Sequence, residues 1–158
     1  MTEEQQFTTL LNNELTSLQN LLTTIHQEYD ALIGTDVEAL EIATLQKNNA
    51  LAKQAETTIA RQNYVVTVNG KSAEEIELKK LITKYSNQAQ LLTTLNQLHV
   101  IAEQCQTANR TNGKLILQKQ QYTRNALDIL RQADSKPSTY SGQGDSVTQT
   151  EGRILGKA

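Results

Sequence analysis

The chain has 158 residues, with 15 basic and 17 acidic side chains, a formal net charge of -2, and only 37% hydrophobic and 4% aromatic residues. Globular domains contain about 45 to 50% apolar residues, so this composition favours an elongated helical molecule. The absence of a basic block excludes nucleic acid as a partner, and the acidic N-terminus and short apolar runs predict neither a signal peptide nor stable membrane insertion, hence a cytoplasmic protein.

The first predicted element is a long helix over residues 2–33. It contains neither Gly nor Pro, and its apolar residues recur in alternating steps of four and three, which is typical of a heptad seam. The seam positions are Leu11, Leu15, Leu18, Leu22, Ile25, Tyr29 and Leu32. Gly34 then favours a left-handed C-terminal residue, and Thr35 and Glu38 have the spacing of a capping box, which together predict a turn into a second helix.

The second helix is predicted over residues 36–66, and the Asn69-Gly70 pair predicts a loop after it. Ser72 and Glu75 repeat the capping-box spacing and predict the start of a third helix over residues 73–133. Gly113 is the expected weak point of this helix. Its seam consists of Leu91, Leu98, Ile101, Cys105, Ala108, Asn112, Leu115, Tyr122, Ala126 and Ile129.

These elements predict an all-α fold, an elongated antiparallel three-helix coiled-coil-like bundle with a long third helix. The helical domain should cover residues 1–134. Beyond it the chain is rich in Ser, Thr, Gly and Gln and poor in apolar residues. Residues 135–158 are therefore predicted to form a flexible, disordered C-terminal tail, in which Tyr140 is an aromatic residue without a core to join.

No group of residues predicts an enzyme, a metal site or a cofactor. Cys105 is the sole cysteine and is expected to be a small buried core residue. His26 and His99 each lack a second ligand at a suitable spacing. The first turn of the third helix is expected to contain Glu74, Glu75 and Glu77, because the positive end of the helix dipole stabilises acidic side chains. These glutamates are not expected to act as catalytic groups.

The apolar stripes of the long helices are the remaining candidate for function. An amphipathic helix of a partner protein could fill a groove between them. Alternatively, the stripes could be satisfied within the chain's own bundle or in a homodimer. The residues alone leave these two interpretations open.

Several short patterns resemble the FlgN-type flagellar export chaperones. In the first hairpin, the matching positions are Glu28, Ala31, Leu32, Asp36, Leu40, Lys47 and Leu51. In the last helix, the Asn-x-x-Asn-x-x-Leu and Ala-Leu-x-x-Leu patterns fall on Asn109, Asn112, Leu115, Ala126, Leu127 and Leu130. The tail "PSTYSGQGDS" resembles the family's Pro-x-x-Tyr-x-x-x-Gly pattern, and "GRILGKA" resembles its basic end.

The resemblance implies a cytosolic helical chaperone without enzymatic activity. Such a chaperone binds the C-terminal segments of the hook-filament junction proteins FlgK and FlgL, prevents their premature assembly and delivers them to the export-gate protein FlhA. The implied substrate-binding residues are Asn109, Asn112, Leu115, Tyr122, Ala126, Ile129 and Leu130. Tyr140 takes the place of the family's gate-docking tyrosine.

Two alternatives accompany this prediction. Asn112 lies on the predicted seam, where a buried Asn could set the register of the helices at some cost in stability, or it is a solvated helix position. The chain could also be a structural coiled-coil protein of a secretion or scaffold machine, whose stripes are filled by self-association.

Overall fold

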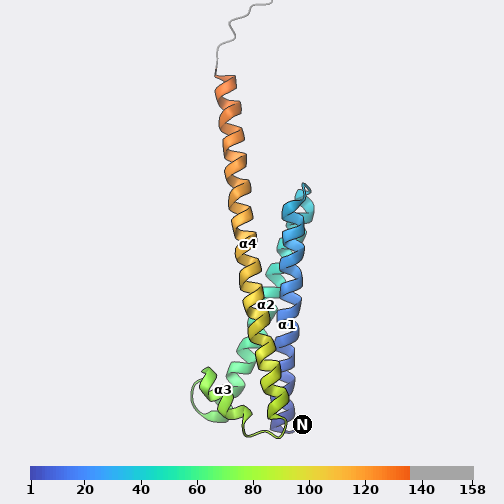
Figure 1. Ribbon diagram of the computed structural model, residues 1–158, viewed down its shortest axis with the longest axis vertical. Helices are drawn as coiled ribbons and strands as arrows, with labels where there is room; N and C mark the ends of the chain where they lie inside the picture. Colours follow the sequence, from blue (N-terminus) through green and yellow to red (C-terminus); the bar gives the residue numbers. More distant parts are fainter. Residues whose placement is uncertain (136–158) are drawn as a thin grey trace, which may run out of the picture. The chain divides into compact units, whose positions relative to one another are not determined.

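The computed structural model describes residues 1–135, and within them it contains four helices and no strand (Figure 1). The helices are α1 (Glu3–Ile33), α2 (Val37–Asn69), α3 (Glu75–Ile82) and α4 (Gln88–Asp134). The all-α prediction is confirmed. The prediction of three helices is wrong, because the region assigned to one helix contains both α3 and α4. The contacts divide the chain into two compact units, with the boundary after Leu117.

Both ends of α1 have a clear local cause. The Thr2 side chain accepts a hydrogen bond from the Gln5 N–H, and the Gln5 side chain accepts one from the Thr2 N–H, which completes a capping box. The helix ends at Gly34, whose backbone is extended with φ -71° and ψ 178°. The left-handed conformation expected for Gly34 is therefore wrong.

The N-terminal cap of α2 is Asp36 rather than Thr35, because the Asp36 carboxylate accepts a hydrogen bond from the Ala39 N–H at 3.2 Å. The left-handed glycine of this fold lies at the other end of α2, where Gly70 has φ 66° and ψ 17°. The helix includes Asn69 and so extends three residues beyond the predicted end at residue 66.

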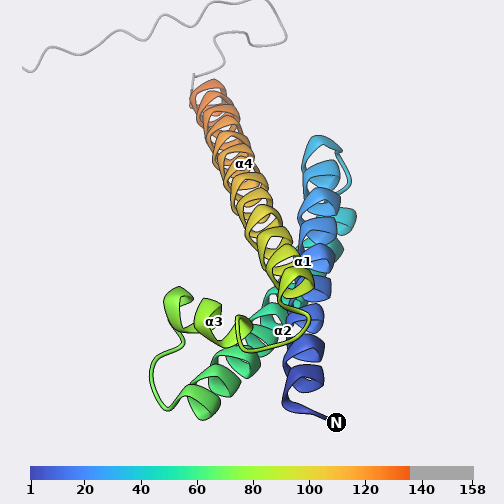
Figure 2. The ribbon, with the colours of Figure 1, turned by 60° about the horizontal axis from the view of Figure 1, so that its bottom comes forward.

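α3 is a short helix that follows a connection after α2 (Figure 2). Its N-cap is Glu74, so the capping box predicted from Ser72 and Glu75 is wrong. Glu75 and Glu77 do lie in its first turn, as expected. The apolar face of α3 buries Leu78, Leu81 and Ile82, and this burial holds the short helix in place.

The predicted third helix is interrupted at residues 83–87, not at Gly113, which lies inside α4. The interruption has a tertiary cause, since the Glu4 carboxylate accepts hydrogen bonds from the Ser86 hydroxyl at 2.8 Å and from the Asn87 N–H at 3.2 Å. Ser and Asn form helix interiors poorly and cap helices well. Glu4 therefore ties the start of α4 to the start of α1.

The core seam of α1 is shifted from the predicted one. All of its buried residues except Ser17 recur in steps of four and three, and these seam residues are Phe7, Leu11, Glu14, Leu18, Leu21, Ile25, Glu28 and Leu32. Of the predicted seam, Leu15 and Leu22 are only half-buried and Tyr29 is 38% exposed. The prediction failed because two seam positions are glutamates, which an apolar pattern cannot identify.

The core continues through α3 and the first half of α4. At its lower end, Phe7 is fully buried, and its ring lies 5.9 Å from that of Tyr64 and 5.8 Å from that of Tyr85. In α4, Leu91, Leu95, Leu98 and Cys105 are buried, which confirms the expectation for Cys105. From Leu117 to Ser135 every residue is exposed.

The predicted boundary between a helical domain and a tail stays a prediction. Residues 136–158, which include Tyr140 and the basic end, lie outside the residues that the structure describes.

Candidate functional site

A polar cluster inside the helix bundle brings together three helices. The Glu28 carboxylate is 1% exposed and accepts hydrogen bonds from Lys47 Nζ at 2.8 Å and from Asn112 Nδ2 at 2.9 Å. Thr44 Oγ1 donates to the same carboxylate at 3.3 Å. We refer to Glu28, Thr44, Lys47 and Asn112 as the Glu28 cluster. Three of these positions belong to the motifs that carried the family resemblance, so residues far apart in the sequence meet at one place.

A second buried ion pair lies further down the same hairpin. Glu14 is 4% exposed, and its carboxylate accepts hydrogen bonds from Arg61 Nε, from an Arg61 terminal nitrogen at 3.2 Å and from Thr58 Oγ1 at 2.9 Å. We refer to Glu14, Thr58 and Arg61 as the Glu14 cluster. The sequence patterns do not predict this group.

The two clusters repeat the same arrangement. Glu14 and Glu28 are two heptads apart on α1, while Arg61 and Lys47 are two heptads apart on α2 in the opposite direction. Thr58 and Thr44 follow the same spacing. The repeat shows that α1 and α2 form an antiparallel hairpin in one continuous heptad register. An apolar pattern alone does not identify these two glutamates, and their only sequence signal is that each fills the gap between two apolar residues seven positions apart, Leu11 and Leu18 or Ile25 and Leu32.

The first half of α4 packs parallel to α1. Cys105 Sγ lies 3.6 Å from the Leu18 carbonyl oxygen, and Asn112 Nδ2 lies 2.9 Å from the Ile25 carbonyl oxygen. Both pairs are separated by 87 residues in the chain, so the two helices advance in the same direction. The thiol of Cys105 has a raised pKa because burial disfavours the thiolate. It is therefore a packing residue and not a reactive nucleophile.

The structure separates the predicted substrate-binding residues into two groups. Asn112 is 1% exposed and is held inside the Glu28 cluster, which agrees with the buried alternative for this residue. Leu115 is half-buried, and Asn109 is exposed with its amide oxygen 3.4 Å from Lys47 Nζ. The remaining predicted residues are exposed on the last part of α4, and they are Tyr122, Ala126, Ile129 and Leu130. We refer to these four as the α4 face.

The α4 face continues the seam of the first half of the helix. Leu98, Cys105 and Asn112 are buried at seven-residue spacing, and Tyr122, Ala126 and Ile129 extend the four-three pattern beyond them. Tyr122 is 77% exposed, Ile129 is 66% exposed and Leu130 is 61% exposed. Large apolar side chains that share one stripe of a helix are suited to contact another amphipathic helix.

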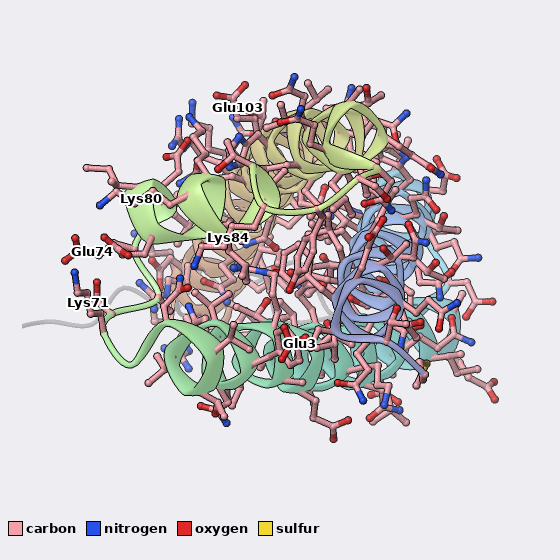
Figure 3. All side chains as sticks on the ribbon, turned by 90° about the horizontal axis from the view of Figure 1, so that it is seen from below. Glu3, Lys71, Glu74, Lys80, Lys84 and Glu103 are labelled. Carbon is pink, nitrogen blue, oxygen red and sulfur yellow. The ribbon has the colours of Figure 1, made fainter. Side chains whose placement is uncertain are left out.

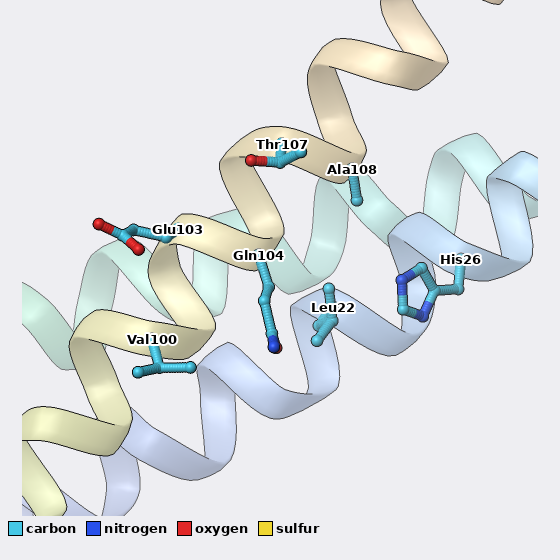
Figure 4. Close-up of a pocket in the computed structure, with 7 residues that line it drawn as sticks. All are labelled: Leu22, His26, Val100, Glu103, Gln104, Thr107 and Ala108. Atoms are coloured by element: carbon cyan, nitrogen blue, oxygen red, sulfur yellow. The ribbon is translucent and has the colours of Figure 1, made fainter.

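A groove of about 640 Å³ lies between α1 and α4 (Figure 4). The apolar side chains that line it are those of Leu22, Val100 and Ala108. His26 and Glu103 lie at opposite ends of the groove and do not point toward one another, so they do not form an acid–base pair. The groove therefore supplies apolar contact area rather than catalytic groups.

The surface of α3 and of the connection before it carries mixed charge, with Lys71, Glu74 and Lys80 at the outer edge (Figure 3). Exposed ion pairs join Lys79 to Glu75 at 2.7 Å and Lys80 to Glu77 at 2.8 Å. Each lysine donates a hydrogen bond to its partner's carboxylate, which lowers the pKa of Glu75 and Glu77. The alternating signs do not form a patch that would attract an extended charged ligand.

The described part of the chain lacks both a metal-binding cluster and a membrane-spanning helix. Residues 1–135 contain no group of three or more His, Cys, Asp or Glu side chains that could hold a metal ion. None of their helices is long and apolar enough to cross a membrane.

Within the described residues, the fold and the α4 face define an all-helical protein that carries apolar side chains on an exposed part of a long amphipathic helix. The model of the FlgN protein family matches residues 1–148, and the chain therefore belongs to the FlgN family, whose members are chaperones of flagellar biogenesis. Neither a curated protein nor a solved structure matches the chain significantly. The predicted family is confirmed, and with it the role of a flagellar export chaperone in general.

Proposed function

We propose that this chaperone binds the C-terminal helical segments of FlgK and FlgL through the α4 face. The observation that carries the proposal is the seam of α4, which is buried as far as Asn112 and exposed at Tyr122, Ile129 and Leu130. A partner helix with its own apolar stripe would cover these side chains as α1 covers the earlier part of the seam. Binding would hide the partner's stripe and prevent premature assembly of the junction proteins in the cytoplasm.

Delivery to the export gate is the second part of the proposal. Tyr140 lies in the segment after α4, where an aromatic side chain offers a large apolar surface for a pocket on FlhA. The family model extends to residue 148 and thus includes this position. Holding the substrate on the α4 face and docking through Tyr140 would allow one chain to contact both partners. The role requires binding alone and no enzymatic step.

Co-purification tests the proposal. The full chain and the C-terminal segment of FlgK or FlgL should elute together from a sizing column in a stoichiometric complex. Failure of both segments to bind the folded chain would contradict the proposal.

A second candidate function, self-association as a structural coiled coil, is favoured by a different surface. Leu45 and Ile59 are 61% and 53% exposed, and they share one stripe of α2 with Ala52 and Val66 at seven-residue spacing. Two copies could pair through this stripe into a homodimer. A stable oligomer that ignores the FlgK and FlgL segments would favour this function over the first.

A further inference from the structure

The position of α4 along α1 is not determined by its apolar residues. Both seams repeat every seven residues, and a shift of α4 by one heptad would again place apolar side chains against apolar side chains. Such a shift moves the helix by about 10 Å, because each residue of an α-helix rises 1.5 Å. Something other than hydrophobic burial must select the observed register.

The Glu28 cluster supplies a contact that does not repeat every heptad. Asn112 Nδ2 donates to the Ile25 carbonyl oxygen and to the Glu28 carboxylate, both at 2.9 Å, and the residue is 1% exposed. The seam residue one heptad before Glu28 is Leu21, which has no side-chain acceptor. A one-heptad shift would thus leave a buried amide without its carboxylate, which is unfavourable.

The Glu14 cluster does not offer the same contact in the observed register. The α4 residue two heptads before Asn112 is Leu98, which is buried and apolar. The hollow beside Glu14 is lined by Leu98 and by residues of α3, among them Leu78. Of the two equivalent carboxylates on α1, only Glu28 receives a hydrogen bond from a side chain of α4 among the described residues.

We propose that the Glu28 cluster pins the register of α4 against the α1–α2 hairpin and so determines which residues of α4 are left exposed. Asn112 is the positioning residue, Glu28 is its side-chain partner on α1, and Lys47 of α2 compensates the charge of Glu28. In this register Leu115 is half-buried and exposure is continuous from Leu117 to Ser135. The cluster thereby sets where the exposed surface of α4 begins. The inference concerns the position of the helix and does not depend on which protein binds it.

Distance measurement between two spin labels tests the register directly. The labels are attached to cysteines at the exposed positions Gln19 on α1 and Gln106 on α4, in a chain that carries Cys105→Ala. The starting chain should give one distance. Asn112→Leu should keep the helical circular-dichroism spectrum and add a second distance population, which corresponds to an axial shift of about 10 Å.

Thr94→Val is the matched control. Thr94 is also a buried polar residue of α4, but its hydroxyl donates to the Gln90 carbonyl within the same helix and cannot report on register. This variant should keep the single distance. Because the measurement uses no partner protein, its outcome is separate from that of the proposed function.

A second variant covers the case in which Asn112→Leu does not fold. Replacing Glu28, Lys47 and Asn112 together by Leu removes the whole polar contact without leaving a buried charge, and this variant should also give more than one distance. If every folded variant without Asn112 keeps the single starting distance, the connection at residues 83–87 and the Glu4 contacts set the register, and the proposal is wrong.

Discussion

Glu14 and Glu28 occupy equivalent positions of α1, and each forms a buried ion pair with a cation of α2. Neither glutamate is balanced by a neighbour on its own helix, so the charge of each is compensated only when the hairpin has formed in the observed register. Burying a carboxylate without a partner is far more costly than leaving it in water. The two pairs therefore act against a shifted hairpin more than they add to stability.

We expect Arg61→Leu to lower the free energy of unfolding by about 3 kcal/mol, because it leaves the Glu14 carboxylate buried without its cation. The double variant Glu14→Leu with Arg61→Leu should recover most of this loss, since an apolar pair needs no compensation. Urea unfolding at neutral pH measures both values. The exposed pair of Lys53 and Glu56, with side chains 68% and 67% exposed, is the control, and Lys53→Leu should change stability by less than about 0.5 kcal/mol.

The sequence was sufficient to predict α1 and α2, but insufficient to predict the seam of α1 and the break between α3 and α4. The long apolar repeats and the lack of Gly and Pro identified α1 and α2, because helix-forming patterns are local properties of the chain. The core positions of Glu14 and Glu28 could not be found by an apolar pattern. The break at residues 83–87 was also missed, because it depends on hydrogen bonds from Ser86 and Asn87 to Glu4, more than 80 residues away in the chain.

At the candidate site too, the sequence predicted the pattern within one helix but not the contacts between helices. The heptad pattern of the last helix predicted the α4 face, and the motif positions Glu28, Lys47 and Asn112 were recognised by resemblance. Their meeting in one cluster could not be predicted, since it requires both the hairpin register and the parallel packing of α4. Asn112 is accordingly a buried structural residue in this fold, whereas Tyr122, Ile129 and Leu130 remain exposed candidates for binding.

Substitution by alanine should have opposite effects on the stability of the chain at two glycines. Gly70 has φ 66°, so Gly70→Ala forces a left-handed conformation on a residue with a Cβ atom and should cost about 1 kcal/mol. Gly113 lies within α4 and an added Cβ would meet nothing within 4 Å, so Gly113→Ala should stabilise the chain by about 0.5 to 1 kcal/mol. Thermal unfolding followed by circular dichroism checks both signs, and a destabilising Gly113→Ala would contradict the helical environment of this residue.

Alkaline pH should destabilise the part of the core around Phe7, because the hydroxyl of the neighbouring Tyr85 loses its proton. Burial is the main cause that raises the pKa of the Tyr85 hydroxyl above its ordinary value of about 10. The folded chain thus holds this proton more tightly than the unfolded chain, and the stability is unaffected well below pH 10 and falls as the pH rises above it. Tyr85→Phe should weaken this alkaline loss, measured as the difference in melting temperature between neutral and alkaline buffer.

Tyr122→Phe is the control for the pH experiment, because Tyr122 is 77% exposed. It should leave the alkaline loss unchanged. An equal effect of the two substitutions would mean that Tyr85 does not carry the pH dependence.

If the α4 face binds the FlgK C-terminal segment, Ile129→Asp should weaken this binding by about tenfold or more, because it would place a charge without a partner in an apolar contact. Ile129 is 66% exposed in the free chain, so the melting temperature should change little. Titration of a labelled segment measures the affinity. Leu117→Asp is the matched control, because Leu117 is 67% exposed but lies on the opposite side of α4 from Ala126. Equal affinities of the two variants would exclude the α4 face as the binding surface.

Tyr140→Ala should separate delivery from substrate binding. If Tyr140 docks on FlhA, the variant should keep its melting temperature and its affinity for the FlgK segment while its binding to the cytosolic domain of FlhA and the swimming motility of cells decrease. The loss follows from removing a large apolar surface that an aromatic anchor would bury in a pocket. Tyr140→Phe, which keeps most of this surface, should retain more gate binding than Tyr140→Ala. A lower melting temperature of Tyr140→Ala would show instead that the tyrosine packs on the helical part of its own chain, and the docking role would have to be abandoned.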